Sequence, residues 1–238
     1  FRSLPLLGNR TAVWIIAELH LMFAAFVLGV PIFAFITEII GVATKEKRYD
    51  DLAREFTKLL AMAYTVTAVL GCLLLVLFVV LYPKLTSYLS KLFKPTWLLY
   101  IVLIFGEVVI AYLYWYTWDV LQGAKKHWHL FIGVMVNLFG TALLFVADIW
   151  VTFMMSPAGI DKETGRFLGS TWAAVANPLW IPLAIHRFLG NIAFGGLIAG
   201  AYAAVKFLGA RSEAAKAHYD WMGYVGNFVA MAALISMP

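Results

Sequence analysis

The stretch AELHLMFAAFVLGVPIFAFI, residues 17–36, decides the fold class, because about 20 mostly apolar residues suffice to cross a lipid bilayer as one helix. The stretch NPLWIPLAIHRFLGNIAFGGLIAG, residues 177–200, has the same apolar character. The first contains His20 and the second contains His186. An imidazole in hydrocarbon is costly unless it is paired, so both histidines are candidate functional residues. Imidazole is also a common axial ligand of haem iron, and the pair therefore predicts a haem-binding membrane protein.

The composition indicates a membrane setting for the whole chain. Of the 238 residues, 63% are hydrophobic and only 13% are charged, whereas soluble domains average about 45–50% apolar and about 25% charged residues. The net charge of +5 needs no nucleic-acid partner, because membrane proteins carry extra lysine and arginine in their cytoplasmic loops. The only cysteine, Cys72, lies in an apolar run, so no disulfide can form among these residues.

Six apolar segments are long enough, or nearly so, to cross the bilayer as helices. No alternating pattern suggests barrel strands, so we expect an all-α bundle of six transmembrane helices in a single membrane domain, residues 1–238. Pro31 in the first segment and Pro182 in the fifth predict kinks. The longest join, residues 156–178, is expected to hold a short interfacial helix. The six segments are residues 11–40, 59–82, 97–120, 130–155, 179–207 and 218–237.

The distribution of basic residues predicts the orientation in the membrane. The joins after the first, third and fifth segments hold ten lysines and arginines, and the N-terminus and the other joins hold seven. By the positive-inside rule, the N-terminus then lies outside. With that orientation, His20 lies about 13 Å and His186 about 10 Å along their helices from the outer ends. Two imidazoles at one depth on separate helices suit two haems rather than one cofactor that bridges the two faces of the membrane.

Other polar residues are candidates for the chemistry of such a site. Glu107 lies in the middle of the third segment, where a carboxyl either forms a structural hydrogen bond or serves in a proton path. Arg10 and Arg187 are candidates to bind haem propionates, because a guanidinium group matches carboxylate geometry, and Arg10 is equally placed to snorkel to the interface. His127 and His129 are expected at a membrane interface, where aromatic and basic residues collect.

Taken in order, the polar residues and their spacings resemble subunit I of the cytochrome bd-type quinol oxidases, over the first six helices of that family. An arginine precedes the first histidine by ten residues, and an Asn-Pro pair begins nine residues before the second. The VADIW stretch at 146–150 is similar to the family's Val-Ala-Asn-Gly-Trp. The other residues that carry the resemblance are Arg10, His20, Gly29, Glu38, Tyr49, Lys58, Glu107, Trp118, Asp119, Asn177, Pro178 and His186.

The resemblance implies a role for each histidine. It implies that His20 ligates a high-spin haem of an oxygen-reducing pair, and that His186 ligates a low-spin haem b that receives electrons from quinol on the outer face. It further implies two or more haems, of b type with a haem d not excluded, and quinol as the electron donor. The implied setting is the bacterial cytoplasmic membrane, with a second oxidase-type subunit or a C-terminal half as partner.

Two positions depart from the family's pattern. Leu99 stands where the family has the first of two glutamates eight residues apart, and Asp148 replaces the family's asparagine. The resemblance does not extend to the family's later helices, which supply a methionine ligand and a glutamate ligand. Three functions therefore stay open: a subunit that passes electrons from quinol towards oxygen, an electron-transfer module that serves another acceptor such as a cytochrome c, and a haem-free transporter subunit.

Overall fold

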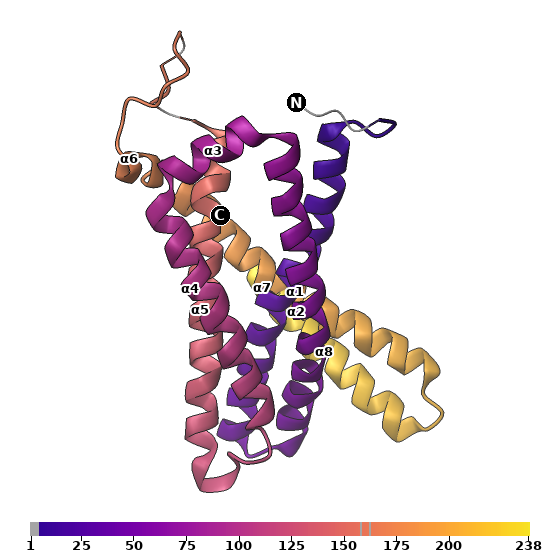
Figure 1. Cartoon of the computed structure of the whole chain (residues 1–238). Helices are drawn as coiled ribbons and strands as arrows, with labels where there is room; N and C mark the ends of the chain where they lie inside the picture. The colour runs from indigo at the N-terminus through magenta and orange to yellow at the C-terminus, as the bar shows by residue number, and fades with distance from the viewer. Residues whose placement is uncertain (1–4, 158, 162) are drawn as a thin grey trace.

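The computed structural model describes residues 5–157, 159–161 and 163–238, and it confirms the all-α prediction. Within these residues the chain is helical apart from its joins and one isolated β-bridge, between Ile160 and Phe167. Each of the six predicted apolar segments corresponds to one long helix. The long helices form an elongated bundle (Figure 1). These helices are α1 (Asn9–Thr44), α2 (Lys47–Leu81), α4 (Lys94–Tyr116), α5 (Lys126–Met155), α7 (Trp180–Gly209) and α8 (Glu213–Ile235). α4 ends at Tyr116 and α8 at Ile235, before the predicted ends at residues 120 and 237.

Shorter helices occupy the joins. The short helix expected within residues 156–178 is present as α6, and the Ser170 side chain caps its first turn. The segment of α3, in contrast, reads as a polar join in the sequence but is helical. Pro83 suits the first turn of a helix and Lys91 suits its last turn, which explains why α3 forms. The short helices are α3 (Pro83–Leu92), η1 (Gly123–Lys125) and α6 (Thr171–Val175).

Several long helices begin before the apolar segments that predict them. α2 begins at Lys47 rather than near residue 59, because the charged residues in between are good helix formers and include an ion pair between Lys47 and Asp51. Pro182 removes no hydrogen bond from within α7, so the reason for predicting a kink there does not apply. This proline lies in the first turn of α7, where a backbone N–H has no acceptor within the helix.

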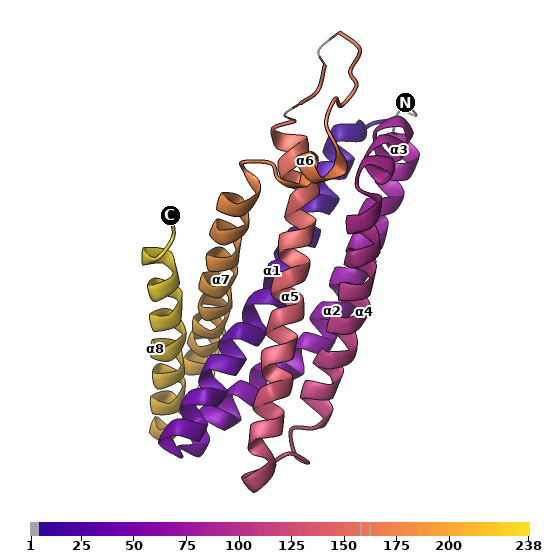
Figure 2. The same ribbon diagram turned by 90° about the vertical axis from the view of Figure 1, so that its left-hand side faces the viewer.

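Five segments of the described chain are long and apolar enough to cross a membrane. They are α1, α2, α4, α5 together with η1, and α7. α8 has the length of a span, but its first half carries the polar residues Lys216, His218 and Asp220. It runs antiparallel to α7 and packs along it (Figure 2). The sixth span therefore stays a prediction, although the sixth helix is present.

The long helices are arranged as three antiparallel hairpins, α1 with α2, α4 with α5, and α7 with α8 (Figures 1 and 2). α1 is central, because it contacts α2, α5 and α7. One end of the bundle, which we call the N-terminal end, carries the N-terminus, α3, α6 and the long join before α7. The opposite end, the turn end, carries the three hairpin turns. Consequently α1, α4 and α7 all begin at the N-terminal end.

Glycines let α1, α7 and α8 pack backbone against backbone. A Cβ on Gly29 would lie 2.1 Å from the carbonyl oxygen of Asn191, and a Cβ on Gly195 would lie 2.4 Å from the carbonyl oxygen of Gly29. α7 and α8 meet in the same way, since a Cβ on Gly226 would lie 2.7 Å from the carbonyl oxygen of Gly196. Small residues at helix crossings are typical of membrane proteins. These contacts fix the position of α7, and of its histidine, relative to α1.

Candidate functional site

His20 lies half-buried on α1, with its ring against α2. Its Nδ1 lies 3.2 Å from the carbonyl oxygen of Thr67, and because a carbonyl only accepts, Nδ1 carries the proton. The ring fits against α2 because Gly71 has no side chain, and a Cβ there would lie 3.0 Å from His20 Cε1. Nε2 has no hydrogen-bond partner among the described residues. His20 therefore presents an oriented imidazole with one nitrogen available.

His186 lies in the second turn of α7 and is exposed on the surface of the described chain. Within that part of the chain its ring makes no hydrogen bond. The helical rise places His186 about 9 Å, and His20 about 16 Å, from the starts of their helices. Because α1 and α7 both begin at the N-terminal end, the two imidazoles lie in the same half of the bundle, as the sequence predicts.

An ion pair links α7 to α5 beside His186. The Arg187 guanidinium donates to Oδ1 of Asp148, whose side chain is fully buried. The second carboxylate oxygen, Oδ2, is also buried and has no partner among the described residues. Arg187, predicted to bind a propionate, is thus already paired with a carboxylate of its own chain.

Glu107 lies buried in α4 and faces α2 and α5. The Tyr64 hydroxyl donates to its Oε1 at 3.2 Å. The carboxyl borders a cavity between α1, α4, α5 and α7, and the cavity has room for about one water molecule. Asn137, Thr141 and Asn191 add polar atoms to its lining, and Oδ1 of Asn137 has no partner in the described chain. The site can therefore hold a proton or a water at membrane depth.

Arg10 lies exposed near the start of α1. It lines an open surface pocket with Trp14 from the same helix and with Phe78 and Tyr82 from the end of α2. Among the described residues its guanidinium has no carboxylate partner. The position satisfies the sequence prediction of a basic residue near the membrane interface, and it leaves the guanidinium available to an anionic group.

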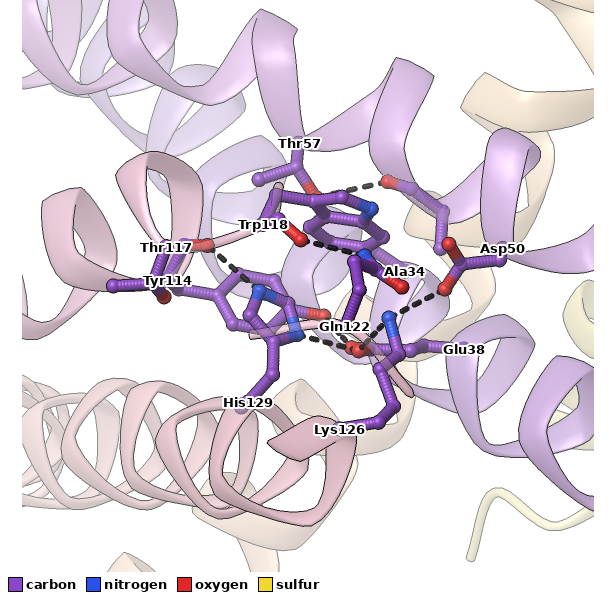
Figure 3. Close-up of polar contacts among 12 residues, drawn as sticks. Ala34, Glu38, Asp50, Thr57, Tyr114, Thr117, Trp118, Gln122, Lys126 and His129 are labelled. Carbon is purple, nitrogen blue, oxygen red and sulfur yellow. Dashed lines mark hydrogen bonds and ion pairs between the residues drawn. The ribbon is translucent and has the colours of Figure 1, made fainter. Parts of the chain in front are cut away.

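The densest polar network lies at the turn end, where α1, α2, α4 and α5 meet (Figure 3). Oε1 of Glu38 accepts from Lys126 Nζ at 2.8 Å and from His129 Nδ1 at 2.5 Å, and the Tyr114 hydroxyl donates to the other oxygen. Lys126 also donates to Oδ1 of Asp50 at 2.5 Å. We call these five residues the charged cluster. Glu38 and His129 are fully buried in it.

Both ring nitrogens of His129 form hydrogen bonds within the cluster. Its Nε2 lies 2.9 Å from the carbonyl oxygen of Tyr114, which can only accept, so Nε2 carries a proton. Its Nδ1 faces the carboxyl group of Glu38, which also accepts from Tyr114 and Lys126. Every polar side-chain group of the buried pair Glu38 and His129 is therefore paired within the charged cluster.

The sequence predicts both His127 and His129 at an interface, and the structure separates them. His127 is exposed, whereas His129 is buried in the charged cluster. Lys126 and His129 are three residues apart on α5 and therefore share one helix face. Two basic side chains on one face of α5 could have been matched with Glu38, which lies near the end of an apolar helix. This pattern is the sequence signal that could have indicated the pairing.

Fold and site together define an integral membrane helix bundle that carries imidazoles, carboxyls and a buried ion pair at membrane depth. The chain belongs to the cytochrome bd terminal oxidase subunit I family, whose model matches residues 9–237. It is similar to a putative cytochrome bd menaquinol oxidase subunit I of Bacillus subtilis (strain 168), with 26% identity over 195 residues, 82% of this chain and 43% of that protein. The structure resembles the bd oxidase from Geobacillus thermodenitrificans, with a TM-score of 0.79 and 19% identity over 94% of this chain and 53% of that chain.

These comparisons confirm the resemblance stated from the sequence, and they also limit it. The chain spans about half the length of the relatives that it matches. The family implies haem, and the geometry of two residues fits an axial ligand. His20 has an oriented ring with Nε2 available, and His186 has an exposed ring without a polar partner in the described chain.

Proposed function

We propose that the chain is the haem-binding part of a bd-type quinol oxidase-like complex in the respiratory chain. In this proposal electrons pass from quinol through a low-spin haem b at His186 towards a second haem at His20, and then to oxygen. The observation that carries the proposal is the pair of available imidazoles at membrane depth, on a chain whose family model matches residues 9–237.

The residues of this chain would bind and orient the cofactors. Haem supplies the one-electron redox chemistry when it is bound. His20 and His186 would ligate iron, and the Thr67 carbonyl would hold the His20 ring in the required tautomer. Arg10 supports propionate binding because its guanidinium has no partner in the described chain. Arg187 is a weaker propionate candidate, because it is already paired.

Glu107 is proposed as a station of the proton path that oxygen reduction requires. The carboxyl would accept a proton on Oε1 or Oε2 and pass it on by rotation of the side chain. The Tyr64 hydroxyl and the neighbouring water-sized cavity support this role, because they provide a hydrogen-bonded exit from a buried carboxyl.

The proposed setting is the bacterial cytoplasmic membrane, with the N-terminal end outside. There His20 and His186 would lie closer to the outer face, where quinol would deliver its electrons. Proposed partners are membrane lipids, quinol, and a second oxidase-type subunit or a C-terminal half, because the chain spans only about half of its relatives.

A second candidate function is an electron-transfer module that gives electrons to a different acceptor, such as a cytochrome c. Leu99 favours it. This apolar and exposed side chain stands on α4 where the resemblance calls for the first of two glutamates, so α4 lacks one of the two carboxyls that the family carries on this helix.

A reduced-minus-oxidised optical spectrum of the purified complex tests both functions. Soret and α-bands of haem b are expected in either case, and an additional long-wavelength chlorin band would favour the oxidase over the module. A spectrum without haem bands would overturn both and leave the haem-free transporter subunit.

A further inference from the structure

The ion pair between Asp148 and Arg187 lies directly beside a proposed haem ligand, since Arg187 follows His186 on α7. We propose that this pair sets the local charge next to His186 and thereby the reduction potential of the haem at that position. The inference rests on the proposed function, because it requires His186 to ligate a haem. It assigns Asp148 and Arg187 as positioning and potential-setting residues, a role distinct from ligation.

The pair is placed where a charge is poorly screened. The Asp148 side chain is fully buried, and that of Arg187 is 27% exposed. The residues that follow Asp148 on α5 include Ile149, Trp150 and Phe153, whose side chains are buried in a hydrophobic cluster. Charges in such a setting interact more strongly than charges in water.

Among the described residues, the carboxylate of Asp148 is paired with a single cation, the guanidinium of Arg187. Arg187 donates to Oδ1 of Asp148, and Oδ2 is buried without any donor in the described chain. A buried carboxylate oxygen is usually satisfied by hydrogen bonds, so this one calls for an explanation. With Oδ2 unsatisfied, the negative charge of Asp148 is balanced by the guanidinium alone. The two residues therefore act as a matched pair, and removal of either leaves a net charge in the bundle.

The pair is tied rigidly to the proposed ligand. Arg187 follows His186 directly on α7, and the two Cα atoms are about 3.8 Å apart. Arg187 points towards α5, whereas the side chain of His186 is exposed. The ion pair therefore lies on the side of His186 that faces the interior of the bundle.

The sign of the effect follows from electrostatics. Reduction adds one negative charge at the haem, which the Arg187 cation favours and the Asp148 anion opposes. A unit charge about 10 Å away, at an effective dielectric constant of about 20, changes the ratio of reduced to oxidised haem by about tenfold. That ratio corresponds to about 59 mV for one electron.

The experiment is a spectroelectrochemical titration of the low-spin haem in the assembled complex, with four variants. Asp148→Asn should raise the midpoint potential and Arg187→Gln should lower it, each by a roughly tenfold change in the reduced-to-oxidised ratio at fixed poise. The double variant should return close to the wild type. Asp119→Asn, which removes the anion of an exposed ion pair with Arg54 at the turn end, is the matched control and should leave the potential unchanged.

Potentials that do not move in either single variant, or that move in the same direction in both, would overturn the inference. If Asp148→Asn fails to assemble, Arg187→Lys and Arg187→Gln provide the same test, because lysine keeps the charge and should keep the potential. A haem signal that is absent from the wild type, or that survives in His186→Ala, would instead overturn the proposed function. The two failures are therefore distinguishable.

Discussion

At the scale of single residues, Glu38 shows how a buried charge can define where four helices meet. The carboxylate accepts from three donors that come from α4 and α5, and it has no exposed surface. Loss of one partner from a buried ion pair costs about 3–5 kcal/mol, because the remaining charges stay buried without compensation. Exposed ion pairs contribute only about 0–1 kcal/mol.

We therefore expect Glu38→Gln to destabilise the protein strongly. The variant leaves Lys126 and His129 with one anion, Asp50, in place of two, and the expected loss is about 3–5 kcal/mol of unfolding free energy. Denaturant unfolding in detergent micelles measures it. Asp119→Asn is the control, since it breaks the exposed pair with Arg54 and should cost less than about 1 kcal/mol. Equal losses in the two variants would contradict the assigned role of Glu38.

Polar residues inside apolar runs could be identified from the sequence, because burying such a residue in a membrane is energetically costly. His20, His186 and Glu107 each interrupt an apolar run, and all three lie on helices that are long and apolar enough to cross a membrane. His129 could not be identified in this way, because it lies near the start of a helix beside lysines and looks interfacial. Its partner Glu38 is 91 residues away, and only the tertiary fold brings them together.

At the scale of elements, the crossing of α1 and α7 determines how the two histidine-bearing helices are placed. The backbones approach so closely at Gly29 and Gly195 that neither position has room for a side chain. In a bilayer, helices associate through such close packing, because lipid tails are as apolar as the side chains that they replace. The crossing therefore couples stability to the position of His186.

Gly29→Ala should force α1 and α7 apart. The added Cβ would lie 2.1 Å from the carbonyl oxygen of Asn191, so backbone must shift, at an expected cost of about 1–3 kcal/mol or more. Gly209→Ala is the control, because Gly209 is the last residue of α7 and a Cβ there meets nothing within 4 Å. We expect it to be neutral or slightly stabilising, as alanine is the better helix former. Thermal unfolding of both variants provides the comparison, and a Gly29→Ala variant as stable as Gly209→Ala would refute the close approach.

The six long helices could be predicted from apolar length, but their ends and the short helices could not. Apolar segments mark the part of a helix inside the bilayer, whereas the first turns of α2 and the whole of α3 mix polar with apolar residues and form through helix propensity and packing. The kink predicted at Pro182 also depended on where a helix begins. The effect of this proline depends on whether it falls inside a helix or in its first turn, which requires the boundary to be known.

At the scale of the whole molecule, the arrangement of the hairpins gives the bundle two different ends. The turn end carries the charged cluster and the three hairpin turns, and the N-terminal end carries α3, α6 and the long join (Figure 2). Both proposed haem ligands lie in the half nearer the N-terminal end. The orientation of the bundle in the membrane therefore decides from which side electrons would enter.

Cysteine accessibility tests that orientation. In a Cys72→Ser background, Glu163→Cys in the long join should react with a membrane-impermeant thiol reagent added to intact cells, because we expect the N-terminal end outside. Lys45→Cys, at the turn between α1 and α2, should react only after the cells are permeabilised. The reverse pattern would invert the proposed topology.

The most direct test of the central claim, that the imidazole of α7 holds a haem, is the reduced-minus-oxidised spectrum of His186→Ala in the assembled complex. We expect the α-band of the low-spin haem to disappear from this variant and the other haem bands to persist. His127→Ala, which alters an exposed histidine at the turn end, should leave the whole spectrum unchanged. A low-spin band that survives intact in His186→Ala would contradict the account.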